Sequence, residues 1–272
     1  MNSTVMRKEA VYVQTFNYHT HTKRCGHASG TDEDYVKAAI QAGYSILGFS
    51  DHAPYKDVPL DWARMSYDKL FDYIQSVNRL KEEYKGRLEI HLGLETEFYP
   101  EYLEEKRKLR DKVEYLILGQ HFTDPSAKRS FFRPSTDEEI LQYAENICRG
   151  LDTGLFTYLA HPDVYVFQQE EFNETCRKAA HIICKKAEET GTPLEINVHG
   201  ILRGKHLFEN GEQYYYPHKD FWRIAAGYNE KCLFGIDAHN PSQLTDLESL
   251  RKAEEELSDL GLQYVKEPLS FR

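Results

Sequence analysis

The chain has 272 residues, of which 40% are hydrophobic and 29% charged, and 34 basic side chains stand against 44 acidic ones for a net charge of −10. This length can bury one large core, and the composition is that of an ordinary soluble globular protein. The acidic balance and the scattered basic residues disfavour a nucleic-acid partner, which would require cations to neutralise phosphates.

The sequence contains no apolar run long enough to span a membrane, and residues 1–7 lack the apolar stretch of a signal peptide. We therefore expect a cytoplasmic protein without membrane partners. Its five cysteines are odd in number and form no Cys-x-x-Cys pair. A disulfide framework and a structural zinc knuckle are thus disfavoured, and most of the thiols are expected to be buried and reduced.

The first predicted strand covers residues 11–18, which are rich in β-branched and aromatic side chains. It ends at His19 and His21, whose two-residue spacing places both imidazoles on one side of an extended chain. A turn at Gly26 could return His27 to the same place. Solvated histidines at a strand end would give the same short motif, so the interpretation depends on the rest of the chain.

Strands and helices then alternate to the end of the chain. Further strands are predicted at 45–50, 88–97, 115–119, 156–160, 193–198 and 232–236. Helices are predicted at 35–40, 70–80, 101–112, 136–148, 171–190 and 244–260, and one more in the stretch that precedes residue 232. Seven strand–helix units without a Gly-, Pro- or Ser-rich linker predict one α/β domain over residues 1–272. Such alternation is typical of a parallel sheet, and seven or eight units favour its closure into a TIM-like barrel.

Histidine and carboxylate side chains recur where these strands end, and in such barrels the active site lies at the carboxyl ends of the strands. With His27, the set offers nine candidate ligands. A single zinc ion that keeps one position open for catalysis cannot use so many. We therefore expect two or three divalent ions, and imidazole with carboxylate suits zinc, iron or manganese. The residues at the strand ends are His19, His21, His52, Glu95, His121, His161, Asp237 and His239.

The third predicted strand contributes two carboxylates. Its alternating pattern turns Glu95 toward the interior of the barrel, and Glu97 points the same way. For Glu97 two interpretations stay open: it could meet a cationic group of a substrate, or it could pair with a neighbouring side chain.

These motifs together resemble the polymerase-and-histidinol-phosphatase superfamily and, within it, the histidinol-phosphate phosphatases. The resemblance covers nearly the whole chain, in the family's order. It implies a distorted seven-stranded (β/α) barrel with a trinuclear metal centre. The motifs are His19-x-His21, His27, Ser50-Asp51-His52, Gly93-Leu94-Glu95, His121, His161-Pro162 and Asp237-x-His239. The implied ligand sets are His19, His21, Glu95 and Asp237 for one ion, Glu95, His121 and His161 for a second, and His27, His52 and His239 for a third.

The resemblance further implies hydrolysis of L-histidinol phosphate, a small phosphate monoester, to L-histidinol and phosphate in L-histidine biosynthesis. A water bridging two ions would lose its proton near neutral pH and act as the nucleophile. Asp237, His239 and Asp163 are the expected catalytic residues, with Asp163 either orienting His161 or protonating the leaving alkoxide. Arg203 resembles the family's phosphate-contacting arginine, although a surface arginine would fit its position as well.

Other functions stay open on the sequence alone. A phosphodiesterase or exonuclease would need a basic groove with stacking aromatics. A phosphatase for another small ester, a non-catalytic metal-binding module and an amidohydrolase share enough of the same pattern to be alternatives.

Overall fold

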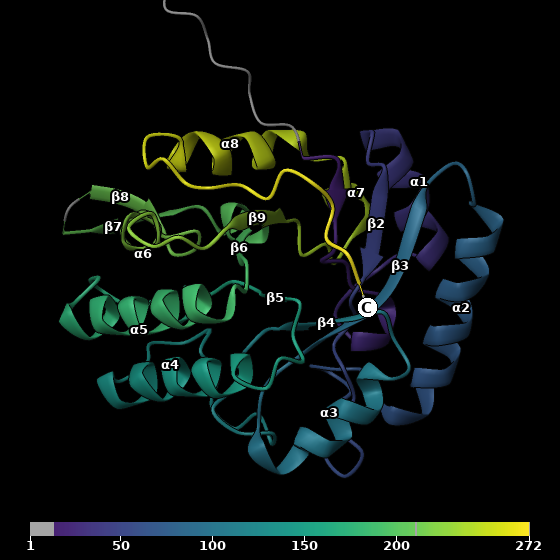
Figure 1. The fold of residues 1–272 in the computed structure, drawn as a ribbon, viewed down its shortest axis with the longest axis horizontal. Helices are drawn as coiled ribbons and strands as arrows, with labels where there is room; N and C mark the ends of the chain where they lie inside the picture. Colours follow the sequence, from purple (N-terminus) through teal and green to yellow (C-terminus); the bar gives the residue numbers. More distant parts are fainter. Residues whose placement is uncertain (1–13, 210, 272) are drawn as a thin grey trace, which may run out of the picture.

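The computed structural model describes residues 14–209 and 211–271, and its central feature is a parallel seven-stranded barrel ringed by helices (Figure 1). Each of the seven strands pairs with the next one of the barrel, and β6 pairs with β9 because the two strands between them form a separate hairpin. The predicted distorted (β/α)7 TIM-like fold is therefore confirmed, while residues 11–13 of the first predicted strand lie outside the described residues. The strands are β1 (Phe16–Asn17), β2 (Ile46–Phe49), β3 (Glu89–Thr96), β4 (Tyr115–Leu118), β5 (Tyr158–Leu159), β6 (Leu194–Asn197) and β9 (Cys232–Gly235).

The barrel closes between its first and last strands just beyond their carboxyl ends. The amide of His21 donates to the carbonyl of Ala238 at 2.9 Å, and the amide of Ala238 donates to the carbonyl of His19 at 3.2 Å. At the other end of the same seam, the side-chain amide of Gln14 donates to the carbonyl of Phe234 at 2.6 Å. The closure therefore joins the first histidine motif directly to the last one.

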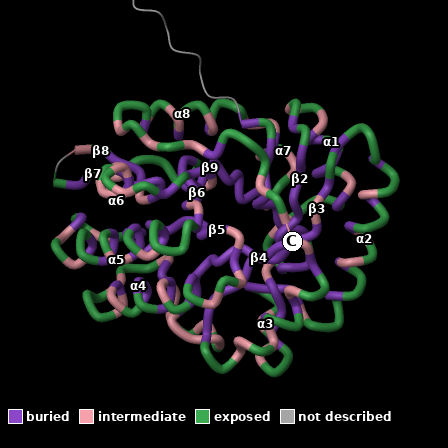
Figure 2. The backbone as a smooth tube through the Cα atoms, in the orientation of Figure 1, coloured by how far each residue is buried: buried purple, intermediate pink, exposed green. Residues whose placement is uncertain are grey.

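The helices surround the strands, with their outer faces exposed and the strands buried (Figure 2). Capping boxes form at the starts of two of the helices, at Thr31 with Asp34 and at Thr136 with Glu139. None of the helices in the described ranges combines the length and the apolar character that a membrane crossing requires. The helices are α1 (Asp32–Ala42), α2 (Leu70–Glu83), α3 (Leu103–Arg110), α4 (Asp137–Leu151), α5 (Glu174–Thr190), α6 (Lys219–Ala225), α7 (Pro241–Leu244) and α8 (Leu247–Leu257).

The segment between β6 and β9 differs from the single helix predicted there. It begins with a 3₁₀ helix, η5 (Val198–Arg203), continues as an antiparallel hairpin of β7 (Lys205–Phe208) and β8 (Gly211–Tyr214), and only then forms the short α6. Gly204 (φ 77°) ends η5, and Gly211 (φ 114°) begins β8. Both glycines adopt backbone angles that other residues rarely reach, which explains how so short a stretch can reverse direction.

Tyr115 fills the middle of the barrel. Its hydroxyl donates to the carbonyls of Tyr18 and Phe49, at 2.8 and 2.9 Å. A side chain at Gly93 would clash with the same ring, because a Cβ there would lie 2.3 Å from it. The C-terminal segment covers the amino ends of β2, β3 and β4: the ring of Phe271 stacks on Tyr115 at 4.6 Å, and the described chain ends beside β3 and β4 in Figure 1.

We predict that Tyr115→Phe lowers the free energy of unfolding by about 1–3 kcal/mol, because two buried carbonyl groups lose their donor while the ring packing is kept. Urea denaturation would measure this. The matched control is Tyr67→Phe, at a tyrosine that is 39% exposed, for which we expect a change within about 0.5 kcal/mol. Equal stability of the two variants would contradict the role assigned to the Tyr115 hydroxyl.

Candidate metal centre

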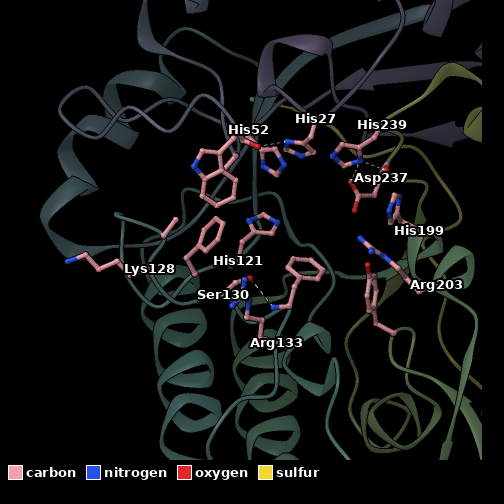
Figure 3. Close-up of a pocket in the computed structure, with 16 residues that line it drawn as sticks. His27, His52, His121, Lys128, Ser130, Arg133, His199, Arg203, Asp237 and His239 are labelled. Atoms are coloured by element: carbon pink, nitrogen blue, oxygen red, sulfur yellow. Dashed lines mark hydrogen bonds and ion pairs between the residues drawn. The ribbon is translucent and has the colours of Figure 1, made fainter.

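The carboxyl ends of the strands meet at a cavity of about 590 Å³ (Figure 3). Five of the predicted ligands line it: His27, His52, His121, Asp237 and His239. The other four, His19, His21, Glu95 and His161, lie beneath them and are at most 1% exposed. The structure thus brings all nine predicted ligands into one cluster.

The Glu95 carboxylate is the centre of this cluster, because five imidazoles surround it. Gly119, just beyond β4, makes room for it, since a Cβ there would lie 1.9 Å from Glu95 Oε1. Glu95 Oε1 lies 2.9 Å from His161 Nε2, 3.3 Å from His121 Nε2 and 3.5 Å from His19 Nε2. Glu95 Oε2 lies 2.9 Å from His52 Nδ1 and 3.6 Å from His21 Nε2.

Asp237 provides the second carboxylate of the cluster. Its Oδ1 lies 2.9 Å from His21 Nε2, 3.5 Å from His19 Nε2 and 3.4 Å from His239 Nδ1. Asp237 has a φ of 53° and His161 a φ of 30°, a backbone region that non-glycine residues occupy at a cost of about 1–3 kcal/mol. Strain of this kind at the ends of two strands is characteristic of a functional site.

Several atoms of the cluster face one another without forming hydrogen bonds. His21 Nε2 and Asp237 Oδ1 are only 2.9 Å apart, yet both are buried atoms without a hydrogen-bond partner in the described chain. His19 Nε2, Glu95 Oε2 and His239 Nε2 are in the same situation. Converging nitrogen and carboxylate lone pairs fit divalent cations, and this mixed donor set suits zinc, iron or manganese.

Two imidazoles that contact the Glu95 carboxylate have pKa values shifted in opposite directions. Burial and the neighbouring His21 lower the pKa of His52 to about 3. Burial acts in the same direction on His121, but the charges of Glu95 and Glu97 outweigh it and raise the pKa of His121 to about 10. Two rings on one carboxylate thus prefer opposite protonation states, whereas metal binding requires the neutral form of both.

Residues behind the ligands fix their orientation. His19 Nδ1 lies 2.8 Å from Glu195 Oε2, and Asn197 donates to both Glu195 (2.6 Å) and Asp237 (3.2 Å). A carboxylate on the second ring nitrogen selects which nitrogen of the histidine is free to bind a metal. The sequence analysis did not single out Glu195 or Asn197, although their alternation with apolar residues in β6 places both inside the barrel.

The rim of the cluster contains His27 and its neighbours. His27 Nδ1 contacts the carbonyls of Cys25 and Trp62, at 3.1 and 3.2 Å. Its ring lies 4.8 Å from that of His239 and 5.2 Å from that of His52, which agrees with the third predicted ligand set. Cys25 is buried beside this set, and burial raises the pKa of its thiol.

The structure does not support either role expected for Asp163. This side chain is fully buried, is absent from the cavity lining, and accepts hydrogen bonds from the amide of His218 (2.7 Å) and the indole of Trp222 (3.1 Å). No hydrogen bond joins it to His161 within the described chain. Burial raises its pKa to about 7. Asp163 therefore anchors the start of α6 rather than serving the cavity.

Arg203 lies at the end of η5, on the rim of the same cavity. Its exposed guanidinium points toward His199 and Asp237, whereas Lys128 extends away from the cluster (Figure 3). The ring of His199 is 5.4 Å from that of His239, so this histidine belongs to the cavity wall as well. The position of Arg203 agrees with the predicted contact to an anionic group.

The remaining wall is largely aromatic and comes from loops after β2 and β4 and from the segment after β8. Trp62, Phe122, Phe132 and Tyr216 line the cavity. Phe131, which precedes Phe132 on the same loop, is 1% exposed and packs into the core instead. Among the other histidines, His91, His181, His206 and His218 are not part of this lining.

Comparison with known proteins is consistent with this geometry. A model of the PHP domain matches residues 17–199. A protein from Deinococcus radiodurans named "Probable histidinol-phosphatase" is 30% identical over 244 residues, which cover 83% of this chain and 86% of that protein. The "Histidinol-phosphatase" of Bacillus subtilis is 26% identical over 254 residues, with 81% and 92% covered.

The fold is also similar to that of a solved structure. The crystal structure of the histidinol phosphate phosphatase of Lactococcus lactis, in complex with zinc, L-histidinol and phosphate, matches with a TM-score of 0.72. The match covers 92% of this chain and 95% of that one, at 18% sequence identity. At this low sequence identity, the match shows that the two proteins share the fold of the barrel.

We predict that His161→Ala reduces the number of zinc ions retained per chain, because this ring is one of the two nearest to Glu95. Elemental analysis after dialysis would give the metal-to-protein ratio. His181→Ala is the matched control, since this histidine lies on the exposed surface of α5, where its ring contacts Tyr228. The same ratio in both variants would remove His161 from the ligand set.

Proposed function

The chain belongs to the PHP domain family, and on this basis we propose that it is a metal-dependent phosphatase that hydrolyses L-histidinol phosphate to L-histidinol and phosphate. The proposal rests on one observation: all nine candidate ligands cluster at a single cavity, and Arg203 lies on the rim of this cavity. Relatives named histidinol-phosphatase that match four-fifths of the chain support the choice of substrate.

Three ligand sets would hold the ions. The deepest set is His19, His21, Glu95 and Asp237, the second is Glu95, His121 and His161, and the third is His27, His52 and His239. When bound, the ions would supply a deprotonated water as nucleophile near neutral pH and positive charge for the phosphoryl oxygens. Glu95 is the only carboxylate within 4 Å of five of these imidazoles in the described chain, which makes it the shared ligand.

The other roles belong to side chains that face the cavity. Arg203 binds phosphoryl oxygens, because its planar fork can donate two hydrogen bonds to one phosphate. Asp237 and His239 both line the cavity with 3.4 Å between Oδ1 and Nδ1, so we assign to them a catalytic role, in which they would orient the attacking water through the ions that they hold. Glu195 keeps the Nε2 of His19 directed toward Glu95.

The shape of the cavity suits a small ester. Its volume of about 590 Å³ is in the range of small-molecule sites, which are about 300–1,000 Å³. The ring of Phe132 lies parallel to that of His121 within 12°, at 6.0 Å, and together with Trp62 and Phe122 it provides flat apolar surface for an imidazole. The phosphate would then face Arg203 and the ligand cluster.

We predict that the protein prefers L-histidinol phosphate to other phosphate esters. Protein of known zinc content should release phosphate from L-histidinol phosphate faster than from an aryl phosphate, and should leave an aryl phosphodiester intact. A chelator should abolish release, and added zinc should restore it, because the cluster holds the catalytic ions. Cleavage of the diester, or full zinc loading without phosphate release, would overturn the proposed function while leaving the metal site in place.

Arg203→Ala should lower kcat/KM for L-histidinol phosphate by roughly 10- to 150-fold, which corresponds to about 1.5–3 kcal/mol for a hydrogen bond to a charged group. The zinc content should not change, because Arg203 is not a ligand. Arg177→Ala on the exposed face of α5, where the side chain contacts Glu174, provides the matched control. An unchanged kcat/KM in Arg203→Ala would contradict phosphate binding by this side chain.

A further inference from the structure

A second buried cluster of charged and aromatic side chains lies directly behind His121. Its members are Tyr55 and Arg64 from the loop after β2, Glu97 just beyond β3, and Lys106 on α3, and none is more than 5% exposed. Charged side chains are seldom buried this deeply without a purpose in the fold or in the site. Among the four, the Glu97 carboxylate approaches a predicted metal ligand, with its Oε1 3.6 Å from His121 Nδ1.

We propose that Glu97, held in place by Tyr55 and Arg64, is a positioning residue that orients His121 as a metal ligand. The inference rests on the proposed metal centre and does not depend on the identity of the substrate. Glu97 itself touches neither the cavity nor the position of the reacting atoms, since it is not among the residues that line the cavity.

The imidazole of His121 lies between two carboxylates, one at each ring nitrogen. Its Nε2 is 3.3 Å from Glu95 Oε1, and its Nδ1 is 3.6 Å from Glu97 Oε1. Histidine ligands usually direct one nitrogen to the metal and the other N–H to a carboxylate, a carbonyl or a water. Glu97 is therefore in the place where it can select the proton position and the ring orientation of His121.

His19 shows the same arrangement elsewhere in this structure. Its Nε2 lies 3.5 Å from Glu95 Oε1, and its Nδ1 lies 2.8 Å from Glu195 Oε2. Two ligands that follow different strands, β1 and β4, thus share one pattern: one ring nitrogen faces Glu95 and the other faces an outer carboxylate. The repetition favours a role in positioning over a chance contact.

Two side chains from the loop after β2 fix the orientation of the Glu97 carboxylate. The hydroxyl of Tyr55 donates to Oε2 at 3.0 Å, which leaves Oε1 for His121 and for Arg64, whose Nη2 is 3.5 Å away. Arg64 also donates to the carbonyl of Pro125 at 3.1 Å. It thereby connects the loop that carries Trp62 to the loop that carries Phe122, and both of these aromatic residues line the cavity.

Lys106 belongs to the same cluster but takes no part in the contact with His121. Its Nζ lies 3.3 Å from the centre of the Tyr55 ring and has no hydrogen-bond partner in the described chain. Arg64 approaches the same ring, with its Cζ 4.5 Å from the centre. Lys106 thus stabilises the cluster through a cation–π contact. Because it is buried as deeply as Glu97, a substitution at Lys106 is a control for general effects on the fold.

The test is a zinc titration of metal-free protein against a chromophoric chelator. Glu97→Gln keeps the size of the side chain and an acceptor for Tyr55 but removes the charge beside His121. We expect the dissociation constant of one zinc ion to rise by about 10- to 100-fold, the usual effect of losing such a partner, while the remaining ions bind as before. Activity measured at limiting zinc should fall and should recover with excess zinc.

Two variants separate positioning from general support of the fold. Lys106→Met should alter thermal stability but leave every zinc dissociation constant unchanged. In a His121→Ala background, Glu97→Gln should cause no further loss of zinc affinity. If Glu97→Gln does not fold, Glu97→Asp replaces it, since the shorter side chain keeps the charge but withdraws it from His121 and should also weaken one zinc ion.

Unchanged zinc affinity in a folded Glu97→Gln or Glu97→Asp variant would overturn the proposal. An equal loss in Lys106→Met would overturn it too, because the cluster would then act only through the fold. Failure of the proposed function is a different result: the wild-type protein would bind zinc with the expected dependence on Glu97 and yet release no phosphate from L-histidinol phosphate.

Discussion

The contact on which the rest of the site depends is that of the Glu95 carboxylate with five imidazoles. A buried carboxylate is costly unless charges or hydrogen bonds compensate for it, and the nitrogens that surround Glu95 are too many for hydrogen bonding alone to satisfy. Divalent ions resolve this conflict, because each can accept lone pairs from several imidazoles and from the carboxylate at once. The barrel must then hold side chains from distant parts of the chain at fixed separations.

The fold provides this rigidity from both ends of the strands. At the carboxyl ends, backbone hydrogen bonds between His21 and Ala238 join the first ligand motif to the last. In the middle, Tyr115 ties the ends of β1 and β2 together through its hydroxyl, and Phe271 covers it from the amino ends. Strain at His161 and Asp237 is tolerated because these surroundings leave no room to relax.

Around the ligands lies a layer of side chains that never reach the cavity. Glu195 directs His19, and in the proposal made above Glu97 directs His121. The same layer supports the cavity walls, since Arg64 connects the loops that carry Trp62 and Phe122. In a phosphatase acting on a small ester, this arrangement would couple the geometry of the ions to the shape of the substrate site.

The sequence by itself determined the alternation of strands and helices, the barrel, and the nine residues that cluster in and beneath the cavity, because side-chain periodicity and position at a strand end are local properties. Tertiary structure alone decided which buried groups face each other. His19 and Glu195 are 176 residues apart, and nothing near either one indicates the other. Likewise, Asp163 contacts Trp222 rather than His161, because it packs against α6. Phe131 faces the core rather than the cavity, because it packs against Tyr143 of α4. The hairpin of β7 and β8 was not predicted either, since its short strands depend on pairing with each other, and pairing is not a property of one segment alone.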